Sequence, residues 1–272
     1  MSESIQKKYY LTEVDKIPGS VYCYHDLMGE ILIESHIHKK GQFIYTEGGV
    51  VFIKTKTKTH YLPARHFMWI PPNVPHAIYP SSPKVIMRNL YFPIKALDHN
   101  FFFKEGIYPV NNLLFEMLLH TKDWKGDIIK KTKNKYVIVM AFKALLEQCA
   151  TQSLLLNLPQ ASDERLNKII NYITTHVHEP HTLAALSERY GVSEKTLYRL
   201  FKKEVGMPFI RYFALLRIFK SLELLVDHTY TIAEIANKVG YTSVPTFSNT
   251  FEKLMGKRPS EYRKANEIYV AS

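Results

Sequence analysis

In the last third of the chain, apolar residues recur at intervals of three and four, the spacing of one buried face of an α-helix. The pattern occurs twice, at an offset of 49 residues up to a glycine in each copy and 50 residues after it. Each copy predicts a helix, a tight turn at the glycine and a second helix, and a repeat of this size indicates a duplicated supersecondary unit. The apolar positions are Leu183, Leu186, Tyr190, Leu197, Leu200 and Phe201 in one copy and Ile232, Ile235, Val239, Phe247, Phe251 and Leu254 in the other.

Residues suited to helix ends flank both copies. Thr231 precedes an apolar run and Glu234 follows three residues later, which is the capping-box pattern. Gly191 and Gly240 can turn the chain through a left-handed conformation at little steric cost. The other expected N-caps are Thr182, Ser193 and Ser243, and the glycines expected to end the second helices are Gly206 and Gly256.

The segment 209–227 between the copies carries an apolar residue at every helical turn and contains no glycine or proline. It predicts one continuous helix of about 19 residues, hence about 28 Å long. Two second helices held near the ends of such a rod could enter successive major grooves of DNA, which repeat about every 34 Å. The mismatch predicts either a bent DNA site or one copy that docks less fully.

Residues 162–268 resemble the DNA-binding module of the AraC family of bacterial transcription regulators. The resemblance is carried by both copies, and above all by residues 240–251, Gly-Tyr-Thr-Ser-Val-Pro-Thr-Phe-Ser-Asn-Thr-Phe, followed by Gly256, Pro259 and Tyr262-Arg263. It implies that the second helix of each copy reads the major groove.

The resemblance also implies which side chains face the DNA. Arg199 could bind the O6 and N7 atoms of guanine, whereas the lysines mostly neutralise phosphates. Asn249 stands where the family commonly has a basic residue, so we expect the first copy to supply most of the base recognition. For any single side chain, the alternative is a solvated surface residue without a role. The implied DNA-binding residues are Lys195, Thr196, Tyr198, Arg199, Lys202 and Lys203 in the first copy and Val244, Pro245, Thr246, Ser248 and Asn249 in the second.

Residues 17–97 show a different pattern, in which short alternating apolar runs are interrupted by glycines and prolines. This spacing predicts an antiparallel sandwich or small barrel. His36 and His38 are two residues apart on a predicted strand, so both imidazoles point to the same face. With His76 from a later strand, three nitrogen donors could converge.

This segment resembles the cupin sensor domain of one branch of the AraC family, in which His-x-His-x-x-x-Gln precedes Trp-Ile-Pro-Pro-x-x-Pro-His. The resemblance implies a site for a divalent metal such as zinc, nickel, iron or manganese, with His36, His38, Gln42 and His76 as ligands. Metal-binding cupins usually have a glutamate in place of the glutamine, and an uncharged amide is a poorer ligand. The alternative is a metal-free polar pocket in which the histidines bind an organic effector or each other. Tyr45, Trp69 and Tyr91 are the candidate effector-binding residues, with plain barrel core as the alternative.

Residues 107–157 are predicted to be helical again. The resemblance implies that these helices form a dimer, and the alternative is that they only cover the open face of the barrel. Together these segments predict an α+β protein with a cupin-like sensor barrel at 1–106, a helical dimerisation element and linker at 107–161, and an all-α module with two helix-turn-helix units at 162–272. The predicted apolar seams are Val110, Leu113, Leu114, Met117 and Leu118 in one helix and Val137, Met140, Ala141, Ala144, Leu145 and Gln148 in the other.

Composition is consistent with this division. A length of 272 residues favours two domains, and a net charge of +11 suits an anionic partner. Cys23 and Cys149 are far apart and lack metal-type spacing, which favours a reducing compartment. There is no signal-peptide pattern and no run of about 18 apolar residues that could cross a bilayer, so we expect a cytoplasmic location.

Two classes of function fit these features. The first is a regulator in which a small molecule or metal bound in the barrel changes how a homodimer presents its DNA modules, with RNA polymerase as a further candidate partner. Within this class, the alternative is a metal-free sensor or a vestigial barrel used mainly for dimerisation. The second class is a metal enzyme, but no paired carboxylates accompany the histidines as acid and base, so we expect no enzymatic activity.

Overall fold

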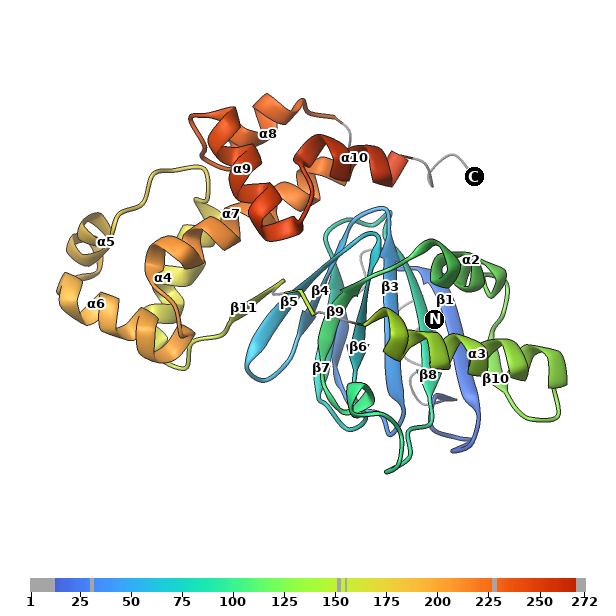
Figure 1. Ribbon diagram of the computed structural model, residues 1–272. Helices are drawn as coiled ribbons and strands as arrows, with labels where there is room; N and C mark the ends of the chain where they lie inside the picture. The colour runs from blue at the N-terminus through green and yellow to red at the C-terminus, as the bar shows by residue number, and fades with distance from the viewer. Residues whose placement is uncertain (1–12, 30–31, 151–152, 155, 227–228, 268–272) are drawn as a thin grey trace, which may run out of the picture. The chain divides into compact units, whose positions relative to one another are not determined.

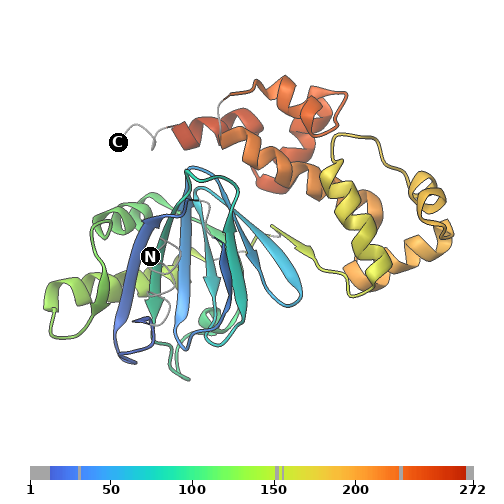
Figure 2. The same cartoon turned by 180° about the vertical axis from the view of Figure 1, so that it is seen from behind.

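The computed structural model describes residues 13–29, 32–150, 153–154, 156–226 and 229–267. The described chain divides into two compact units. The first contains the chain up to Thr55 and Tyr61–Leu156, and the second contains Lys56–His60 and the chain from Asn157 onward. The first is a β-sandwich and the second is helical, as Figures 1 and 2 show, which confirms the predicted α+β architecture.

Within the described residues, the strands form two sheets. One has the order β10-β1-β8-β3-β6-β9 and the other has the order β11-β5-β4-β7-β2. Antiparallel pairing joins β1 to β10 and β8, β3 to β6 and β8, β7 to β2 and β4, β6 to β9, and β11 to β5. This is the arrangement expected for short alternating runs separated by turns. The strands are β1 Val21–Leu27, β2 Ile33–His36, β3 Gly41–Glu47, β4 Val50–Lys54, β5 Lys58–Pro63, β6 His66–Ile70, β7 His76–Pro80, β8 Ile86–Phe92, β9 Gly106–Pro109, β10 Gly126–Ile128 and β11 Asn157–Pro159.

Alternation along β3 assigns the two faces of the larger sheet. Phe43 packs against Phe142 of a covering helix, with ring centroids 5.0 Å apart. Gln42 therefore points the other way, between the two sheets. Both side chains are fully buried, because one sheet face is covered by helices and the other by the second sheet.

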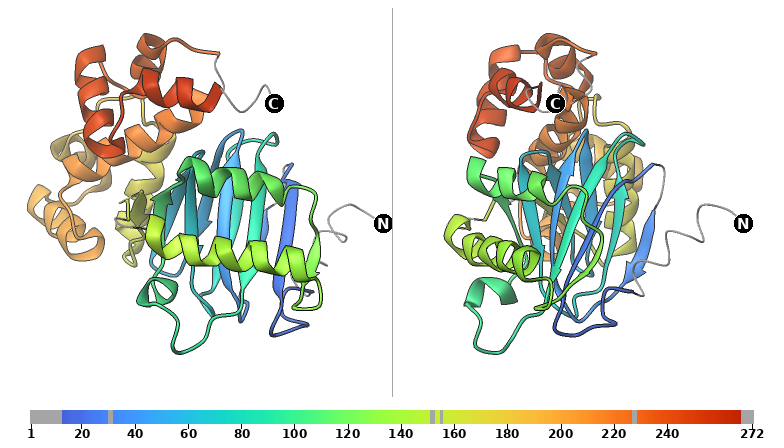
Figure 3. Two further views of the ribbon diagram at one scale, coloured as in Figure 1. Left: turned by 45° about the vertical axis from the view of Figure 1, so that its right-hand side comes forward. Right: turned by 90° about the vertical axis from the view of Figure 1, so that its right-hand side faces the viewer.

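Two helices, α2 Asn112–His120 and α3 Lys133–Cys149, cross the outer face of the larger sheet (Figure 3). Phe115 of α2 contacts Tyr45 of the sheet, with ring centroids 5.8 Å apart. A short 3-10 helix, η1 Asn100–Phe103, lies in the connection after β8. The helices thus form a third layer on the sandwich.

The predicted buried seam of α3 is wrong. The helix buries Val139, Phe142, Lys143 and Leu146, because Phe142 packs on the aromatic rings of the sheet. Val137 remains 65% exposed. In α2, Leu114 and Leu118 are buried as predicted, whereas Leu113 is 56% exposed. The rest of the predicted α3 seam is exposed or half-buried, namely Met140, Ala141, Ala144, Leu145 and Gln148.

The second unit contains the two predicted helix-turn-helix copies. Gly191, Gly206, Gly240 and Gly256 all adopt positive φ, between 63° and 84°, where a side chain would be strained. The predicted helix at 209–227 is α7, which runs to Val226, and residue 227 lies outside the described part of the chain. The helices are α4 Glu164–Thr175, α5 Leu183–Tyr190, α6 Glu194–Leu200, α7 Phe209–Val226, α8 Ile232–Lys238, α9 Val244–Met255 and α10 Pro259–Glu267, with a π-helical turn, η2 Phe201–Val205, after α6.

The side chains predicted to cap these helices do so. Thr231 and Glu234 form the expected capping box at the start of α8. Ser193 and Ser243 accept hydrogen bonds from the first turns of α6 and α9. One detail of packing differs, because α9 buries Met255 rather than the predicted Leu254, which is half-buried. No described helix has the length and apolar character needed to cross a membrane.

Candidate metal centre and nucleic-acid interface

Three histidines from two strands and a turn come together between the sheets. His36 ends β2, His38 lies in the turn that follows, and His76 opens β7, paired with His36. One ring nitrogen from each lies within 4.8 Å of the others. The imidazole rings of His36 and His76 are 4.3 Å apart, centroid to centroid. Pairing of β2 with β7 thus produces the convergence predicted from the sequence.

Each of these imidazoles is oriented by a backbone carbonyl. The Nδ1 atom of His36 lies 2.9 Å from the carbonyl oxygen of Glu34, and that of His76 lies 2.8 Å from the oxygen of Val74. His38 Nδ1 lies 2.6 Å from the oxygen of Lys40. A carbonyl oxygen can only accept, so each Nδ1 carries the proton and each neutral ring keeps a lone pair on Nε2. Such backbone contacts are the usual way in which ligating histidines are held.

Burial keeps the histidines neutral. The pKa of His76 is lowered to about 3, first by burial and then by His36 and His38. Burial also lowers the pKa values of His36 and His38, although their hydrogen bonds act in the opposite direction. The rings are therefore neutral near pH 7.

Gln42 of β3 completes the cluster. Its Oε1 atom lies 3.0 Å from His76 Nε2 and 3.2 Å from His38 Nε2. Its Nε2 group donates to Asn89 Oδ1 at 2.8 Å and to the Tyr91 hydroxyl at 3.0 Å. Gln42 and Asn89 are fully buried, so this network is shielded from water.

The donor set fits a divalent metal ion. In this arrangement, lone pairs from two histidine nitrogens face the lone pairs of the Gln42 oxygen, and no hydrogen lies between them. The Nε2 atom of His36 is buried and has no hydrogen-bond partner in the described structure. A cation among these atoms would satisfy all of them at once, and imidazole suits zinc, nickel and iron.

Of the three candidate effector residues, only Tyr91 lies beside the histidines. Its ring centroid is 5.1 Å from that of His38. Tyr45 is three residues from Gln42 on the same strand and packs against α2 on the opposite face. Trp69 pairs with Phe43 and donates from its indole to the carbonyl of Phe102. The expectation that Tyr45 and Trp69 share a pocket with the histidines is therefore wrong, because alternation and strand register place them in the helix-covered layer.

Two residues that support the cluster, Asn89 and Lys40, were not predicted from the sequence. Asn89 lies two positions before Tyr91 on β8, and alternation alone would have placed it on the same face. Lys40 is almost fully buried, and its ammonium donates to the Ser20 hydroxyl at 2.8 Å, with the Asp127 carboxylate 3.9 Å away. No sequence signal distinguished Lys40 from surface lysines, because its partners lie far away along the chain.

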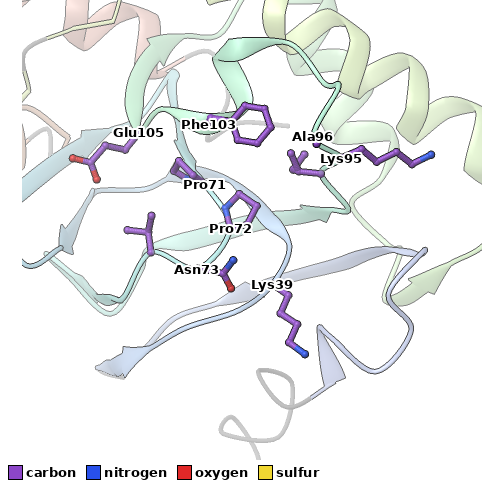
Figure 4. Close-up of a pocket in the computed structure, with 10 residues that line it drawn as sticks. Lys39, Pro71, Pro72, Asn73, Lys95, Ala96, Phe103 and Glu105 are labelled. Atoms are coloured by element: carbon purple, nitrogen blue, oxygen red, sulfur yellow. The ribbon is translucent and has the colours of Figure 1, made fainter.

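A pocket of about 600 Å³ opens at the end of the sandwich beside the histidine loops (Figure 4). The backbone of Asn73, at its floor, donates to the carbonyl of His38 at 2.9 Å. The walls are mostly apolar, and Lys39, Lys95 and Glu105 carry the charged groups. The remaining lining residues are Pro71, Pro72, Val74, Ile94, Ala96 and Phe103.

In the helical unit, the predicted recognition face of the first copy is exposed. Leu197 and Leu200 lie on the buried side of α6. Tyr198 is 49% exposed, so it points away from the core. The other predicted DNA-binding residues of this copy are exposed at Lys195, Arg199, Lys202 and Lys203 and half-buried at Thr196.

The second copy presents a less basic face. Phe247 and Phe251 are buried. Pro245 stands in the first turn of α9, where a missing amide hydrogen breaks no helical bond. The predicted DNA-binding residues are exposed at Val244, Pro245, Thr246 and Asn249 and half-buried at Ser248.

One arginine of α7 contacts both the segment before the first copy and the turn of the second copy. The guanidinium of Arg217 donates to the backbone oxygens of Val177 and Glu179, at 3.3 and 3.0 Å. It also lies over the ring of Tyr241, 5.4 Å from the centroid. Residues just before the first copy and in the turn of the second copy thus contact the same side chain of α7.

Comparison with known proteins adds two family matches. Residues 18–101 match the AraC-like ligand binding domain, and residues 186–265 match a helix-turn-helix domain. The HTH-type transcriptional regulator NimR of Escherichia coli is 24% identical over 241 residues, which cover 89% of this chain and 86% of that protein.

Further matches cover a shorter part of the chain. An uncharacterised response regulatory protein of Staphylococcus epidermidis is 37% identical over 105 residues, which cover 39% of this chain and 41% of that protein. The chain thus matches about two-fifths of the length of this relative. Among solved structures, the C-terminal domain of AraT, a response regulator from Geobacillus stearothermophilus, is 35% identical, covering 38% of this chain and 86% of that one, with a TM-score of 0.37.

Proposed function

We propose that this chain, which belongs to the AraC family because it joins an AraC-like ligand-binding domain to a helix-turn-helix module of the AraC type, is an effector-responsive transcription regulator. The observation that carries the proposal is the pair of recognition helices with exposed faces, held by one continuous helix. Among the described residues, the group that could hold a metal ion consists of His36, His38 and His76 and includes no carboxylate.

The first recognition helix provides most of the base recognition in this proposal. Arg199 is exposed on α6, where its planar guanidinium can form two hydrogen bonds with guanine. Lys203 lies in the π-helical turn beyond α6 and is exposed; its ammonium is 3.6 Å from the Glu204 carboxylate and can turn to a phosphate instead. The second helix offers hydroxyl, amide and apolar groups, which suit positioning and contact with thymine methyl groups.

The test is a binding-site selection from random DNA, followed by affinity measurements on the selected site and on variants of it. Arg199→Ala should cost about 1–3 kcal/mol and relax the preference at one base pair, while Lys203→Ala should weaken binding to all sequences and lower the salt slope by about one. Lys168→Ala, on an exposed position of α4, is the matched control. An equal loss on every sequence from both recognition-helix variants would contradict these roles.

The sensor half of the proposal has two parts. His36, His38, His76 and Gln42 would hold a divalent transition metal, which would offer open coordination positions to an effector. The neighbouring pocket, with its apolar walls and charged rim, suits a small organic molecule with an apolar body. Elemental analysis and mass spectrometry of the purified chain would identify what each site retains.

The exposed apolar side chains of α2 and α3 support a homodimer. Val137 and Leu113 project from the helical layer rather than into the sheet, and exposed apolar side chains could meet their own copies across the axis of a symmetric dimer. RNA polymerase is a further partner in this proposal, because a regulator that activates must contact the transcription machinery.

A further inference from the structure

We propose that the Gln42 side-chain amide reverses its direction when the metal site fills, and so reports metal occupancy to Asn89 and Tyr91. The inference rests on the proposed metal function of the histidine cluster. It concerns a fully buried glutamine that lies between two histidines on one side and two hydrogen-bonding side chains on the other.

The Gln42 side-chain oxygen faces two histidine nitrogens that, like the oxygen itself, can only accept hydrogen bonds. His38 and His76 each give their Nδ1 proton to a backbone carbonyl, so their Nε2 atoms can only accept when the rings are neutral. Gln42 Oε1, which also can only accept, lies 3.2 and 3.0 Å from these atoms. This contact is favourable only if a cation lies among the three atoms.

His38 and His76 are almost fully buried, and their ring centroids lie only 5.1 Å apart. The neutral cluster therefore needs either a metal or a donor in place of the oxygen.

A half turn of the amide supplies that donor. The oxygen and the nitrogen of an amide are similar in size, so exchanging them displaces no neighbouring group. The two hydrogens on Gln42 Nε2 would then point at the lone pairs of His38 and His76. The metal-free cluster would thus satisfy both histidines with one side chain.

The same half turn reverses the hydrogen bonds on the other side. Gln42 Oε1 would face Asn89 and the Tyr91 hydroxyl, which now accept from Gln42 Nε2 at 2.8 and 3.0 Å. Both neighbours can donate instead, Tyr91 by rotating its hydroxyl and Asn89 by turning its own amide. Asn89 Nδ2 is buried without a partner in the present arrangement, so the reversal leaves an oxygen unpaired there in place of an N–H group, which is the less costly defect.

A glutamine is the residue that permits both states. A glutamate would bind the cation more strongly, but without metal its carboxylate would be a buried charge that needs an added proton as its partner. Gln42 gives up some metal affinity and gains a stable empty site, which suits a reversible sensor rather than a permanent metal centre. Metal binding then changes the direction of hydrogen bonding at Asn89 and Tyr91, which Gln42 contacts directly.

The direct test uses the full-length chain with ¹⁵N-labelled glutamine and histidine. In chelator, scalar coupling across N–H···N hydrogen bonds should connect Gln42 Nε2 with the Nε2 atoms of His38 and His76. Saturating zinc should abolish this coupling. The proposal is overturned if the coupling is missing in chelator, if it persists in zinc, or if the wild-type chain does not bind zinc.

Substitutions distinguish a reversal of the Gln42 hydrogen bonds from the simple loss of one of them. Asn89→Asp places a group that can only accept beside Gln42, which favours the metal-bound sense, so zinc should bind about 10-fold more tightly. Gln42→Glu should also bind zinc at least about 10-fold more tightly and should melt at a lower temperature than wild type in chelator. Tyr91→Phe is the matched control, because it loses one hydrogen bond in both states and should shift zinc affinity much less.

A structural role for Asn89 alone would predict weaker zinc binding in Asn89→Asp, which would contradict the proposal. DNA retention is measured on the same preparations. A chain that binds its DNA site but shows no zinc-dependent change at Gln42 would overturn the amide reversal and leave the regulator assignment intact. Loss of DNA binding with the reversal present would overturn the regulator assignment and leave the amide reversal intact.

Discussion

Lys143 lies on the buried face of α3, and its charge is compensated by one loop of the sandwich. The ammonium donates to the Asp98 carboxylate at 2.7 Å and to the carbonyl of Pro93 at 3.3 Å. Partial burial alone would raise the pKa of Asp98, but the hydrogen bonds from Lys143 and from the Lys95 amide outweigh it and hold the pKa below its usual value. The pair therefore fixes α3 to the connection between β8 and η1, which also lines the pocket.

The Lys143–Asp98 pair gives a prediction for stability and its pH dependence. Lys143→Met should lower the free energy of unfolding by about 1–3 kcal/mol at pH 7, because it leaves Asp98 without its charged partner. The depressed Asp98 pKa contributes stability above its unfolded value of about 4 and loses it as the pH falls through the folded value. Urea denaturation at pH 7 and near pH 3 should show the gap between variant and wild type shrinking in acid.

Lys133→Met, at an exposed position of the same helix, is the control and should be near neutral at both pH values. A gap that stayed constant from pH 7 to pH 3 would show that Lys143 acts by packing rather than by its charge.

Individual site residues were predictable where one local rule decides. The spacing of His36 and His38 predicted that both lie on one face of a strand. The structure brings them together with His76, although β2 ends at His36 and His38 lies beyond it. Trp69 was misplaced because its face depends on the register between β3 and β6, which no local pattern specifies. The burial of Lys40 could not be predicted, because its compensating partners, Ser20 and Asp127, are distant in sequence.

At the scale of elements, the turns of the two helix-turn-helix copies share a backbone conformation but differ in their surroundings. Gly191 has a φ of 63°, and a Cβ atom there would meet nothing within 4 Å. Gly240 has a φ of 84°, and a Cβ atom would lie 2.8 Å from the carbonyl oxygen of His178 and 2.5 Å from the Arg217 guanidinium. The second glycine thus also makes room for the Arg217 side chain and the backbone of His178.

This difference predicts unequal effects of the same substitution. Gly191→Ala should cost only the strain of a left-handed alanine, about 1 kcal/mol, since no neighbour is displaced. Gly240→Ala should cost about 1–3 kcal/mol more, because the backbone of His178 cannot yield as a flexible side chain would. Thermal denaturation of both variants measures the difference, and equal losses would show that the close approach is relieved without cost.

Helix positions and ends were predictable because caps, glycines and apolar spacing are local signals. The buried faces of α3 and α9 were less so, since both helices carry apolar residues on more than one side. In α3, Phe142 and Leu146 pack on the sheet while Val137 stays exposed, and this choice depends on the rings that the sheet presents. The π-helical turn after α6 had no recognised signal in the sequence.

At the scale of the whole molecule, the exposed apolar side of α3 bears on assembly. Val137→Glu would place a charge in the proposed self-complementary patch without touching the buried face of the helix. We expect the variant to dissociate at concentrations where wild type is dimeric, as measured by sedimentation equilibrium. Asn171→Glu, the same change in charge on an exposed position of α4, should leave assembly unchanged, and a wild-type chain that is monomeric would refute the dimer itself.

Regulation requires that the effector bind one arrangement of the protein more tightly than another, since equal affinity would shift nothing. The histidine cluster and the recognition helices belong to separate compact units, so binding at one and binding at the other can be perturbed independently. The double variant His36→Ala, His76→Ala should therefore keep the DNA affinity that wild type shows in chelator, but lose any change in affinity on adding zinc. His120→Ala, an exposed histidine on α2, should respond like wild type. Fluorescence anisotropy on the selected DNA site, with and without zinc, measures both quantities, and a double variant that still responded to zinc would move the sensor away from these histidines.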